Sequence, residues 1–350
     1  MAAETSTQEA GAPRKVTFCF DDGVEKEVAV AHDEFVLDAA LRQNVPLVHQ
    51  CRSGSCSTCV AQLIAGNVEM THERSTSLIA AEAAEGKRLL CSAYARADSA
   101  VRLSYPSTLI YEGAPRVFAA TVGALEWPAE TVAKLTLELS GGADFAFHSG
   151  QYVRVRIPET DQWRSYSMAS VSRDVPILQF LVRIIPGGAM SEYLRGRCHG
   201  GDALEVEGPR GAFILRESRA PHIFVAGGTG LAPILSMIDA IRRHSGARPS
   251  MTLSFGCASD AQFFYRDEVE LRQWWMPSLK LILSADRVGS PESGLITGTP
   301  VAALGHVSVG DGATVAYLCG PPPMIAAARK RLEELGVKPE HIYAENFVPS

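Results

Sequence analysis

The sequence of 350 residues has no concentration of positive charge, because its 33 Lys and Arg are outnumbered by 39 Asp and Glu and are scattered along the chain. Nucleic-acid binding requires a basic face that neutralises phosphates, so the net charge of -6 argues against a nucleic-acid partner. The longest uncharged run, residues 223–238, is too short for a transmembrane helix and is broken by Gly and Pro. We therefore expect no membrane partner.

We also expect no targeting peptide, since residues 1–13 have neither a basic start nor an apolar middle and are interpreted as a short disordered tail. The composition is otherwise that of a globular protein, with 46% hydrophobic and 21% charged residues. We expect a cytoplasmic monomer of two or three domains. In a reducing compartment its eight cysteines are not expected to form disulfides, and clustered cysteines instead indicate a metal site.

Four cysteines are the candidate metal ligands. The segment CRSGSCSTC contains Cys51, Cys56 and Cys59, and Cys91 follows after thirty-one further residues. Structural zinc sites usually combine two CxxC pairs, whereas these ligands include only one. The spacing is typical of a plant-type 2Fe-2S cluster, for which one loop supplies three thiolates. We expect such a cluster, with a zinc site or unrelated core cysteines as the alternatives.

The residues on either side of the cysteines agree with this expectation. Residues 15–20 and 26–31 are predicted strands around a DDG turn, and residues 33–44 form a predicted amphipathic helix. With the four cysteines in this order, residues 14–105 resemble the plant-type ferredoxin domain, which implies a β-grasp-like fold. Cys19 lies outside the motif and is expected in the core.

After a predicted linker at residues 105–115, five short segments of alternating hydrophobicity between residues 118 and 208 predict an antiparallel β-barrel. Two motifs in it are candidates for phosphate binding. In GGAMSEYL (187–194), paired glycines precede a helix start, where backbone amides can bind a phosphate. In RSYS (164–167), the arginine can add a charge-assisted hydrogen bond.

Together with GPRGAF (208–213), these motifs resemble the flavin domain of the ferredoxin-NADP reductase superfamily, so residues 116–216 are expected to be an FAD-binding barrel. The resemblance implies that Arg164 binds the pyrophosphate, Tyr166 stacks on the isoalloxazine and Ser167 hydrogen-bonds its central ring. It also implies that the residues at the helix start contact the flavin, namely Gly187, Gly188, Met190 and Ser191.

From residue 220 the pattern alternates between buried strands and helices, which predicts a parallel α/β domain over residues 220–350. The loop GTGLAP has Pro233 where a dinucleotide fingerprint has its third glycine. Paired with CGPPPM (319–324), it nevertheless resembles the nucleotide-binding half of the same superfamily. This resemblance places Cys319 beside the nicotinamide carbon that releases hydride. It implies that the nucleotide contacts Gly228, Thr229, Gly230, Gly320 and Pro321.

The C-terminal YAENFVPS resembles the end of these reductases as well. Phe347 matches the aromatic residue that covers the flavin, and Glu345 matches an acidic residue of the catalytic cluster. The catalytic residues implied by the resemblance are thus Ser167, Cys319, Glu345 and Phe347. Unlike the plant reductases, this chain continues past the aromatic residue with residues 348–350.

The order of ferredoxin, flavin and NAD domains resembles the reductase components of bacterial multicomponent oxygenases, such as the benzoate dioxygenase reductases. The resemblance implies electron transfer from NADH through FAD and the 2Fe-2S cluster to the terminal oxygenase of a Rieske dioxygenase system. Two alternatives remain open: a diiron monooxygenase partner, or a redox sensor without turnover.

NADH is expected to be preferred over NADPH. The strand MTLSFGC (251–257) should end near the adenine ribose, and the next residues, 258–265, contain neither Arg nor Lys to receive a 2'-phosphate. Asp260 could accept hydrogen bonds from the ribose hydroxyls and repel a phosphate. The nearest cation is Arg266.

Overall fold

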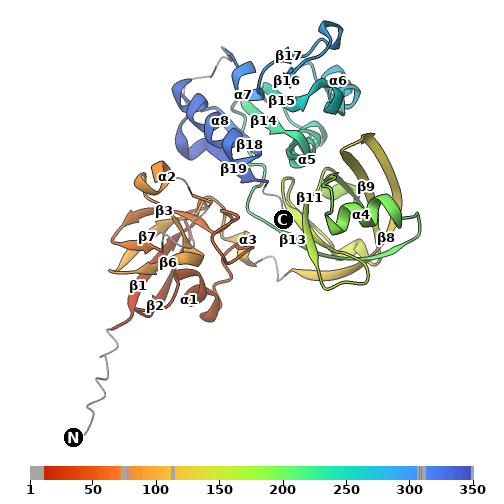
Figure 1. Cartoon of the computed structure of the whole chain (residues 1–350). Coiled ribbons are helices and arrows are strands. Elements are labelled where there is room, and N and C mark those ends of the chain that lie inside the picture. Colours follow the sequence, from red (N-terminus) through yellow and green to blue (C-terminus); the bar gives the residue numbers. More distant parts are fainter. Residues whose placement is uncertain are drawn as a thin grey trace, which may run out of the picture. The chain divides into compact units, whose positions relative to one another are not determined.

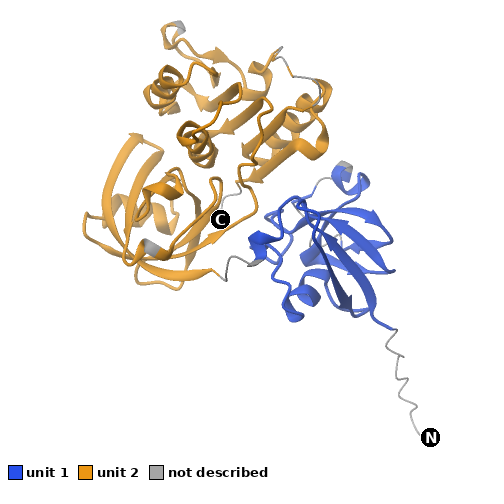
Figure 2. Cartoon of the chain, turned by 180° about the vertical axis from the view of Figure 1, so that it is seen from behind, with its two compact units in different colours: residues 1–114 blue, residues 115–350 orange. Residues whose placement is uncertain are grey.

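The computed structural model describes residues 12–71, 77–78, 80–111, 115–305, 307, 309 and 313–347. Most of the tail expected at residues 1–13, and the residues that follow Phe347, lie outside this part of the chain. The chain divides into two compact units, residues 1–114 and 115–350 (Figure 2). Among the described residues, none of the helices combines the length and apolar character that crossing a bilayer requires.

The first unit contains a five-stranded mixed sheet of order β2-β1-β7-β3-β5 and a two-stranded sheet of β4 and β6 (Figure 1). Strand β1 pairs antiparallel with β2 and parallel with β7. The strands are β1 (Arg14–Cys19), β2 (Glu25–Val30), β3 (Val60–Ala65), β4 (Val68–Met70), β5 (Lys87–Leu89), β6 (Ala93–Ala95) and β7 (Ser99–Arg102). The helices are α1 (Val36–Arg42), α2 (Ala80–Ala84) and α3 (Thr108–Tyr111).

Helix α1 lies between β2 and the cysteine loop and buries its apolar side, formed by Val36, Leu37, Ala39 and Ala40. This spacing of one and three residues gives one face of a 3.6-residue period. The expected linker at residues 105–115 is partly ordered structure. Tyr105 is buried with its hydroxyl accepting a hydrogen bond from the Val48 amide (3.2 Å), and α3 follows it. The chain therefore leaves the first unit later than its Pro and Gly residues suggest.

The second unit begins with a six-stranded antiparallel sheet of order β11-β10-β13-β8-β9-β12. A bridge between Met168 and Phe180 joins the region of its two end strands, which closes the sheet into the expected barrel. The elements are β8 (Arg116–Ala129), β9 (Val132–Leu139), β10 (Tyr152–Arg156), β11 (Trp163–Ser167), β12 (Ile177–Arg183), α4 (Ala189–Gly196) and β13 (Ala203–Arg210). Alternate residues of these strands fill one buried core, as the period of two predicts.

A six-stranded parallel sheet of order β17-β16-β15-β14-β18-β19 follows in the same unit. Its strands are β14 (His222–Gly227), β15 (Met251–Ser259), β16 (Leu279–Arg287), β17 (Ile296–Thr297), β18 (Val315–Gly320) and β19 (Ile342–Asn346). Its helices are α5 (Leu231–Arg243), α6 (Arg266–Trp275), α7 (Pro300–Ala303) and α8 (Pro322–Glu334). Helices α5 and α6 pack on one face and α7 and α8 on the other, which confirms the α/β arrangement.

The barrel and the parallel sheet contact each other within this unit. The Ser236 hydroxyl on α5 donates to the backbone carbonyl of Ser170 (2.7 Å), and Arg243 at the end of α5 pairs with Asp174. Ser236 is fully buried, so its hydrogen bond lies inside the contact. This contact holds the strand end that carries Ser167 against the parallel sheet.

Candidate functional site

The four cysteines predicted as ligands come from two places in the first unit. Cys51, Cys56 and Cys59 lie in the loop between α1 and β3, and Cys91 lies in a single 3-10 turn between β5 and β6. The two places are joined where the Leu90 amide donates to the Cys59 carbonyl oxygen (3.2 Å). The loop reverses at Gly54, whose φ of +79° is a conformation that favours glycine.

Backbone amides point at the first sulfur of this loop. The amides of Ser53 and Ser55 lie 3.3 and 3.4 Å from Cys51 Sγ and donate to it. Burial raises the pKa of the Cys51 thiol, but hydrogen bonds from Ser53, Ser55 and Cys56 outweigh burial and lower the pKa to about 6. Cys51 is therefore prepared to act as a thiolate ligand.

The other thiols are coupled to one another. A hydrogen bond between the Cys59 and Cys91 side chains raises the pKa of the Cys59 thiol and lowers that of the Cys91 thiol. The sulfurs thus form two pairs, Cys51 with Cys56 and Cys59 with Cys91. Each iron of a 2Fe-2S cluster takes two protein sulfurs, so this donor set fits that group. In the described part of the chain, no three His, Cys, Asp or Glu side chains converge on a single metal position.

A second group of predicted residues meets in the other unit, where the barrel faces the parallel sheet. Ser167, at the end of β11, donates through Oγ to Glu345 Oε2 on β19 (3.1 Å). Glu345 stands opposite Cys319 in the parallel register of β18 and β19. The structure therefore brings together three of the predicted catalytic residues, although they are far apart in the sequence.

The environment of this group favours neutral side chains. Glu345 as a residue is half-buried, but the surroundings of its carboxyl exclude water, and this burial raises its pKa to about 8 despite the hydrogen bond from Ser167. Cys319 is fully buried, and desolvation together with the nearby Glu345 raises the pKa of its thiol. At neutral pH both groups keep their protons.

Phe347, the fourth predicted catalytic residue, directly follows β19. Its amide donates to the Gly320 carbonyl oxygen (2.9 Å), and its ring is partly buried against the core between the barrel and the sheet. Phe347 therefore occupies the end of the strand that carries Glu345.

Two residues near the carboxyl were not singled out from the sequence. A Cβ atom on Gly211 would lie 2.9 Å from the Tyr152 ring and 3.9 Å from Glu345 Oε1. Tyr152 on β10 stands opposite Ser167 in the strand register. The available signal was the motif GPRGAF, which contains Gly211, but the distance to Glu345 could not be read from it.

The predicted flavin contacts lie along β11 and at the start of α4. Arg164 donates to the Trp163 carbonyl oxygen (3.1 Å) and to Gln162 Oε1 (2.9 Å), so it is held at the strand edge. Tyr166 packs partly buried against the barrel core, and burial raises the pKa of its hydroxyl. The α4 region supplies Gly187, Gly188, Met190 and Ser191.

The turn before α4 leaves space on its outer side. A Cβ atom on Gly187 would meet no atom within 4 Å, whereas one on Gly188 would lie 3.1 Å from the Ile185 carbonyl oxygen. Ser191 Oγ accepts a hydrogen bond from the Ile185 amide (2.9 Å), which ties the turn to the helix. The start of α4 is thus open on the side of Gly187 and held to the rest of the turn by Ser191, an arrangement that fits a phosphate.

The loop at residues 228–230, which follows β14, also has one glycine facing open space and one packed closely against its neighbours. Gly228 has a φ of +54°, and a Cβ atom there would meet nothing within 4 Å. A Cβ atom on Gly230 would instead lie 2.3 Å from the Cys319 carbonyl oxygen. Gly228 therefore borders open space, whereas the Thr229 side chain is buried and Gly230 allows the loop to approach β18, where Gly320 and Pro321 follow Cys319.

Asp260, predicted to read the ribose, already has partners. Its carboxylate accepts hydrogen bonds from the amides of Ala261 (2.8 Å), Gly289 (2.7 Å) and Ser290 (3.2 Å). These bonds, led by that from Gly289, lower the pKa of Asp260. Arg266 is engaged by Glu270 (3.1 Å) and by the Ser293 carbonyl oxygen. Asp260 keeps its charge but also holds the loop that follows β16.

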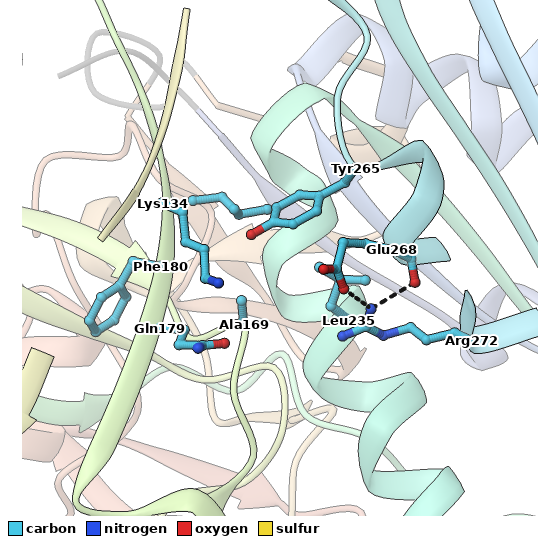
Figure 3. Close-up of a pocket in the computed structure, with 9 residues that line it drawn as sticks. Lys134, Ala169, Gln179, Phe180, Leu235, Tyr265, Glu268 and Arg272 are labelled. Carbon is cyan, nitrogen blue, oxygen red and sulfur yellow. Dashed lines mark hydrogen bonds and ion pairs between the residues drawn. The ribbon is translucent and has the colours of Figure 1, made fainter. Parts of the chain in front are cut away.

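A small cavity of about 40 Å³ lies elsewhere between the barrel and the parallel sheet (Figure 3). In it, Arg272 is held by the Glu268 carboxylate (3.1 Å) and by Asp239 (2.8 Å). None of its lining residues is among those predicted to bind a cofactor. It is lined by Lys134, Ala169, Gln179, Phe180, Leu181, Leu235, Tyr265, Glu268 and Arg272.

Comparison with known proteins identifies three domains in this order. Residues 19–96 match the 2Fe-2S iron-sulfur cluster binding domain, residues 124–214 the oxidoreductase FAD-binding domain and residues 224–330 the oxidoreductase NAD-binding domain. The protein is therefore a flavin- and iron-sulfur-dependent oxidoreductase. The exact limits 14–105, 116–216 and 220–350 remain predictions.

Two relatives and one solved structure match more than nine tenths of the chain. The anthranilate 1,2-dioxygenase electron transfer component of Acinetobacter baylyi is 35% identical over 96% of this chain and 97% of its own. The propane 2-monooxygenase reductase component of Mycolicibacterium smegmatis is 33% identical over 93% of this chain and 95% of its own. The Amycolatopsis cytochrome P450 reductase GcoB has a TM-score of 0.68 and 27% identity over 95% of this chain and 99% of its own. Since these similarities extend through all three domains, the chain belongs to the family of electron-transfer reductase components of oxygenases.

Proposed function

We propose that this protein oxidises NADH and passes the electrons singly to the terminal oxygenase of a ring-hydroxylating Rieske dioxygenase system. The observation that carries the proposal is the hydrogen bond from Ser167 to Glu345, which joins the FAD-binding barrel to the NAD-binding sheet beside Cys319. It puts a hydroxyl, a protonated carboxyl and a buried thiol where a nicotinamide held by one domain would meet a flavin held by the other.

When bound, FAD accepts the two electrons of a hydride together and releases them one at a time, and the 2Fe-2S cluster carries single electrons. The residues of the chain bind and orient these groups. Arg164 and the start of α4 hold the flavin phosphates, whereas Gly228 and Gly230 let backbone amides approach the nucleotide phosphates. The four cysteines and the amides of their loop hold the cluster.

Where the barrel meets the parallel sheet, the side chains of Glu345, Cys319 and Phe347 determine the local charge and the access of water. Glu345 keeps a proton at neutral pH, so it places no negative charge beside the flavin as hydride arrives. Cys319 fills the end of β18 with a neutral group that excludes water. We propose that Phe347 would cover the flavin ring when FAD is bound and no nicotinamide is in place.

The identity of the partner is supported by the relatives. Electron transfer components of anthranilate and toluate 1,2-dioxygenases are 35% and 32% identical to this chain. Reductases of propane 2-monooxygenases reach 33%, so a diiron hydroxylase partner is the second candidate. We further propose that the protein is a cytoplasmic monomer that prefers NADH.

The test begins with the protein purified with its bound cofactors. It should contain FAD, about two irons and about two acid-labile sulfides, and it should reduce cytochrome c with NADH. Lack of turnover would instead support a redox sensor. Adding either a Rieske dioxygenase or a diiron hydroxylase from the same genome then decides the partner, since only the natural acceptor should hydroxylate its substrate at a rate limited by the oxygenase. Size-exclusion chromatography measures the oligomeric state.

A further inference from the structure

Strand β19 carries Glu345 and lies at the end of its sheet. Among the residues that the structure describes, it pairs with β18 and with no other strand. Arg329 of α8 contacts its first residue, donating to the Ile342 carbonyl oxygen (3.5 Å). A side chain placed within about half an ångström for catalysis requires a more rigid support than one ladder of hydrogen bonds.

The face that bears Glu345 also bears a column of stacked rings. Tyr343, two residues before Glu345, stacks on Tyr317 of β18 with ring centroids 5.6 Å apart and an interplanar angle of 24°. Tyr317 stacks in turn on Phe224 (5.5 Å, 19°) and on His222 (5.9 Å, 20°) of β14. The column thus connects the edge strand with the buried middle of the sheet.

The segment that joins the barrel to the sheet, residues 211–221, crosses this column. The Arg216 guanidinium lies over the Tyr343 ring, 4.8 Å from its centroid. The Arg216 amide donates to the Tyr317 hydroxyl (2.8 Å), and Phe213 packs edge-on against the Tyr317 ring (6.1 Å, 70°). One short segment therefore contacts both of the tyrosines beneath the catalytic pair.

The same segment is bound to the barrel at its other side. Gln151 Nε2 donates to the Gly211 carbonyl oxygen (3.1 Å), and the Leu215 amide donates to the Ser149 carbonyl oxygen (3.0 Å). Gln151 directly precedes Tyr152 and Ser149 lies three residues before it, and Tyr152 stands opposite Ser167 in the strand register. Residues 211–221 therefore fix the barrel that carries Ser167 and the strand that carries Glu345 against a common support.

We propose that Arg216 is a positioning residue for Glu345, and that its contact with Tyr343 holds β19 in the place where the carboxyl meets Ser167. The proposal rests on the role of Glu345 proposed above. In the described part of the chain, the titratable groups packed on this face include His222, Cys257, Tyr317, Cys319, Tyr343 and Glu345, and the Arg216 guanidinium lies over the Tyr343 ring. Arg216 contacts two neighbouring rings, because its amide binds the Tyr317 hydroxyl and its guanidinium lies over the Tyr343 ring.

The test compares three variants of the holoprotein. Arg216→Met keeps the aliphatic stem and removes the cation, Arg216→Lys restores a cation, and Arg219→Met removes a charge from an exposed residue of the same segment. In Arg216→Met, we expect the β19 amides to exchange hydrogen about three- to tenfold faster, measured by mass spectrometry. The pH midpoint of flavin reduction by NADH should move below that of the wild type, since water reaches the carboxyl. Arg219→Met should match the wild type, and Arg216→Lys should restore most of both properties.

Wild-type exchange and an unmoved pH midpoint in Arg216→Met would overturn the proposal, as would the same changes in Arg219→Met, which would show a general charge effect. If Arg216→Met does not fold, Tyr343→Phe and Tyr343→Leu provide the second comparison, since only the leucine removes the ring. Where Arg216→Met folds, the double variant Arg216→Met/Tyr343→Leu should exchange no faster than Tyr343→Leu alone. Hydrogen exchange reports on β19 even if Glu345→Gln shows that the carboxyl has no role in hydride transfer, so the two proposals fail separately.

Discussion

The cysteine loop of the first unit and the Ser167–Glu345 pair of the second are built in opposite ways. Three of the four predicted cluster ligands come from the nine consecutive residues of this loop, and hydrogen bonds from within the loop lower the pKa of Cys51. The pair joins residues 178 positions apart, and the pKa of Glu345 is raised by burial between two packed domains. Local sequence therefore determines the first site, whereas tertiary packing determines the second.

The largest expected effect separates the two sites. Cys56→Ser should abolish the cluster's visible absorption and its iron and sulfide, because serine cannot replace a thiolate of a pair without weakening the cluster. Flavin reduction by NADH should remain, since the cluster lies downstream. Cys19→Ser, in the same unit but outside the motif, should keep the cluster. Loss of flavin reduction in a folded Cys56→Ser protein would contradict the electron order.

Arg164→Ala tests a phosphate contact in the barrel. A charged hydrogen bond contributes about 1.5–3 kcal/mol, so the affinity for FAD should fall by about ten- to a hundredfold. Fluorescence titration of the apoprotein measures it, and the exposed Arg173 of the same barrel provides the control as Arg173→Ala. Release of FMN alone from the wild-type protein would show that the FAD assignment is wrong.

Glu345→Gln tests the packed site through its pH dependence. Arriving hydride adds negative charge, so the wild-type rate of flavin reduction should fall about tenfold as the carboxyl ionises near the pKa of about 8, and the variant should not show this fall. Stopped-flow reduction by NADH measures it, with Glu340→Gln as the control. A fall that persists in Glu345→Gln would assign the pH dependence to another group.

Thermal unfolding of the wild type and of Glu345→Gln should test the raised pKa of Glu345 independently. Because folding raises the pKa of Glu345 from 4.5 to about 8, its stabilising contribution is complete below about pH 4.5 and is lost as the pH rises through 8. Glu345→Gln should therefore lose less stability than the wild type between about pH 5 and 9. Parallel stability curves for the two proteins would argue against the raised pKa.

The smallest effect is expected for the nucleotide's 2' position. The wild type should use NADH with a higher kcat/KM than NADPH, and Asp260→Asn should narrow the preference by about threefold to tenfold, because it removes a charge that repels the phosphate. Arg287 stands opposite Ser259 in the strand register, so Arg287→Ala is the informative companion. If the wild type used NADPH as well as NADH, the predicted preference would be wrong. If Arg287→Ala then lost the use of NADPH, Arg287 would be the cation that binds the 2'-phosphate.

The sequence allowed the elements and the cysteine site to be predicted because their signals are local. The cysteine spacing identified the cluster domain, and the alternation of apolar residues identified the barrel and the parallel sheet. The bonds of Asp260 could not be predicted, since its partners Gly289 and Ser290 belong to a loop about thirty residues later. The ordering of Tyr105 was missed for a similar reason, because its partner Val48 lies in another part of the unit.

The contact of Arg216 with Tyr343 shows the same limit most clearly. An arginine between two domains has many possible partners, and only the packing of the ring column selects this one. Motif comparison could assign Ser167 and Glu345 to one site because their surroundings match a known pattern. It carries no information on the supports behind them.

The segment at residues 211–221 also has a consequence for recombining domains among these reductases. A hybrid that takes its barrel from one relative and its nucleotide-binding sheet from another must place a junction near this segment. A junction inside it would separate the carbonyl of Gly211, bound by the barrel, from Arg216, which contacts the sheet. Hybrids that bring Gln151, residues 211–221, Tyr317 and Tyr343 from one parent should retain fast flavin reduction, whereas a hybrid with mixed parents at these positions should fold and bind both cofactors but reduce its flavin slowly.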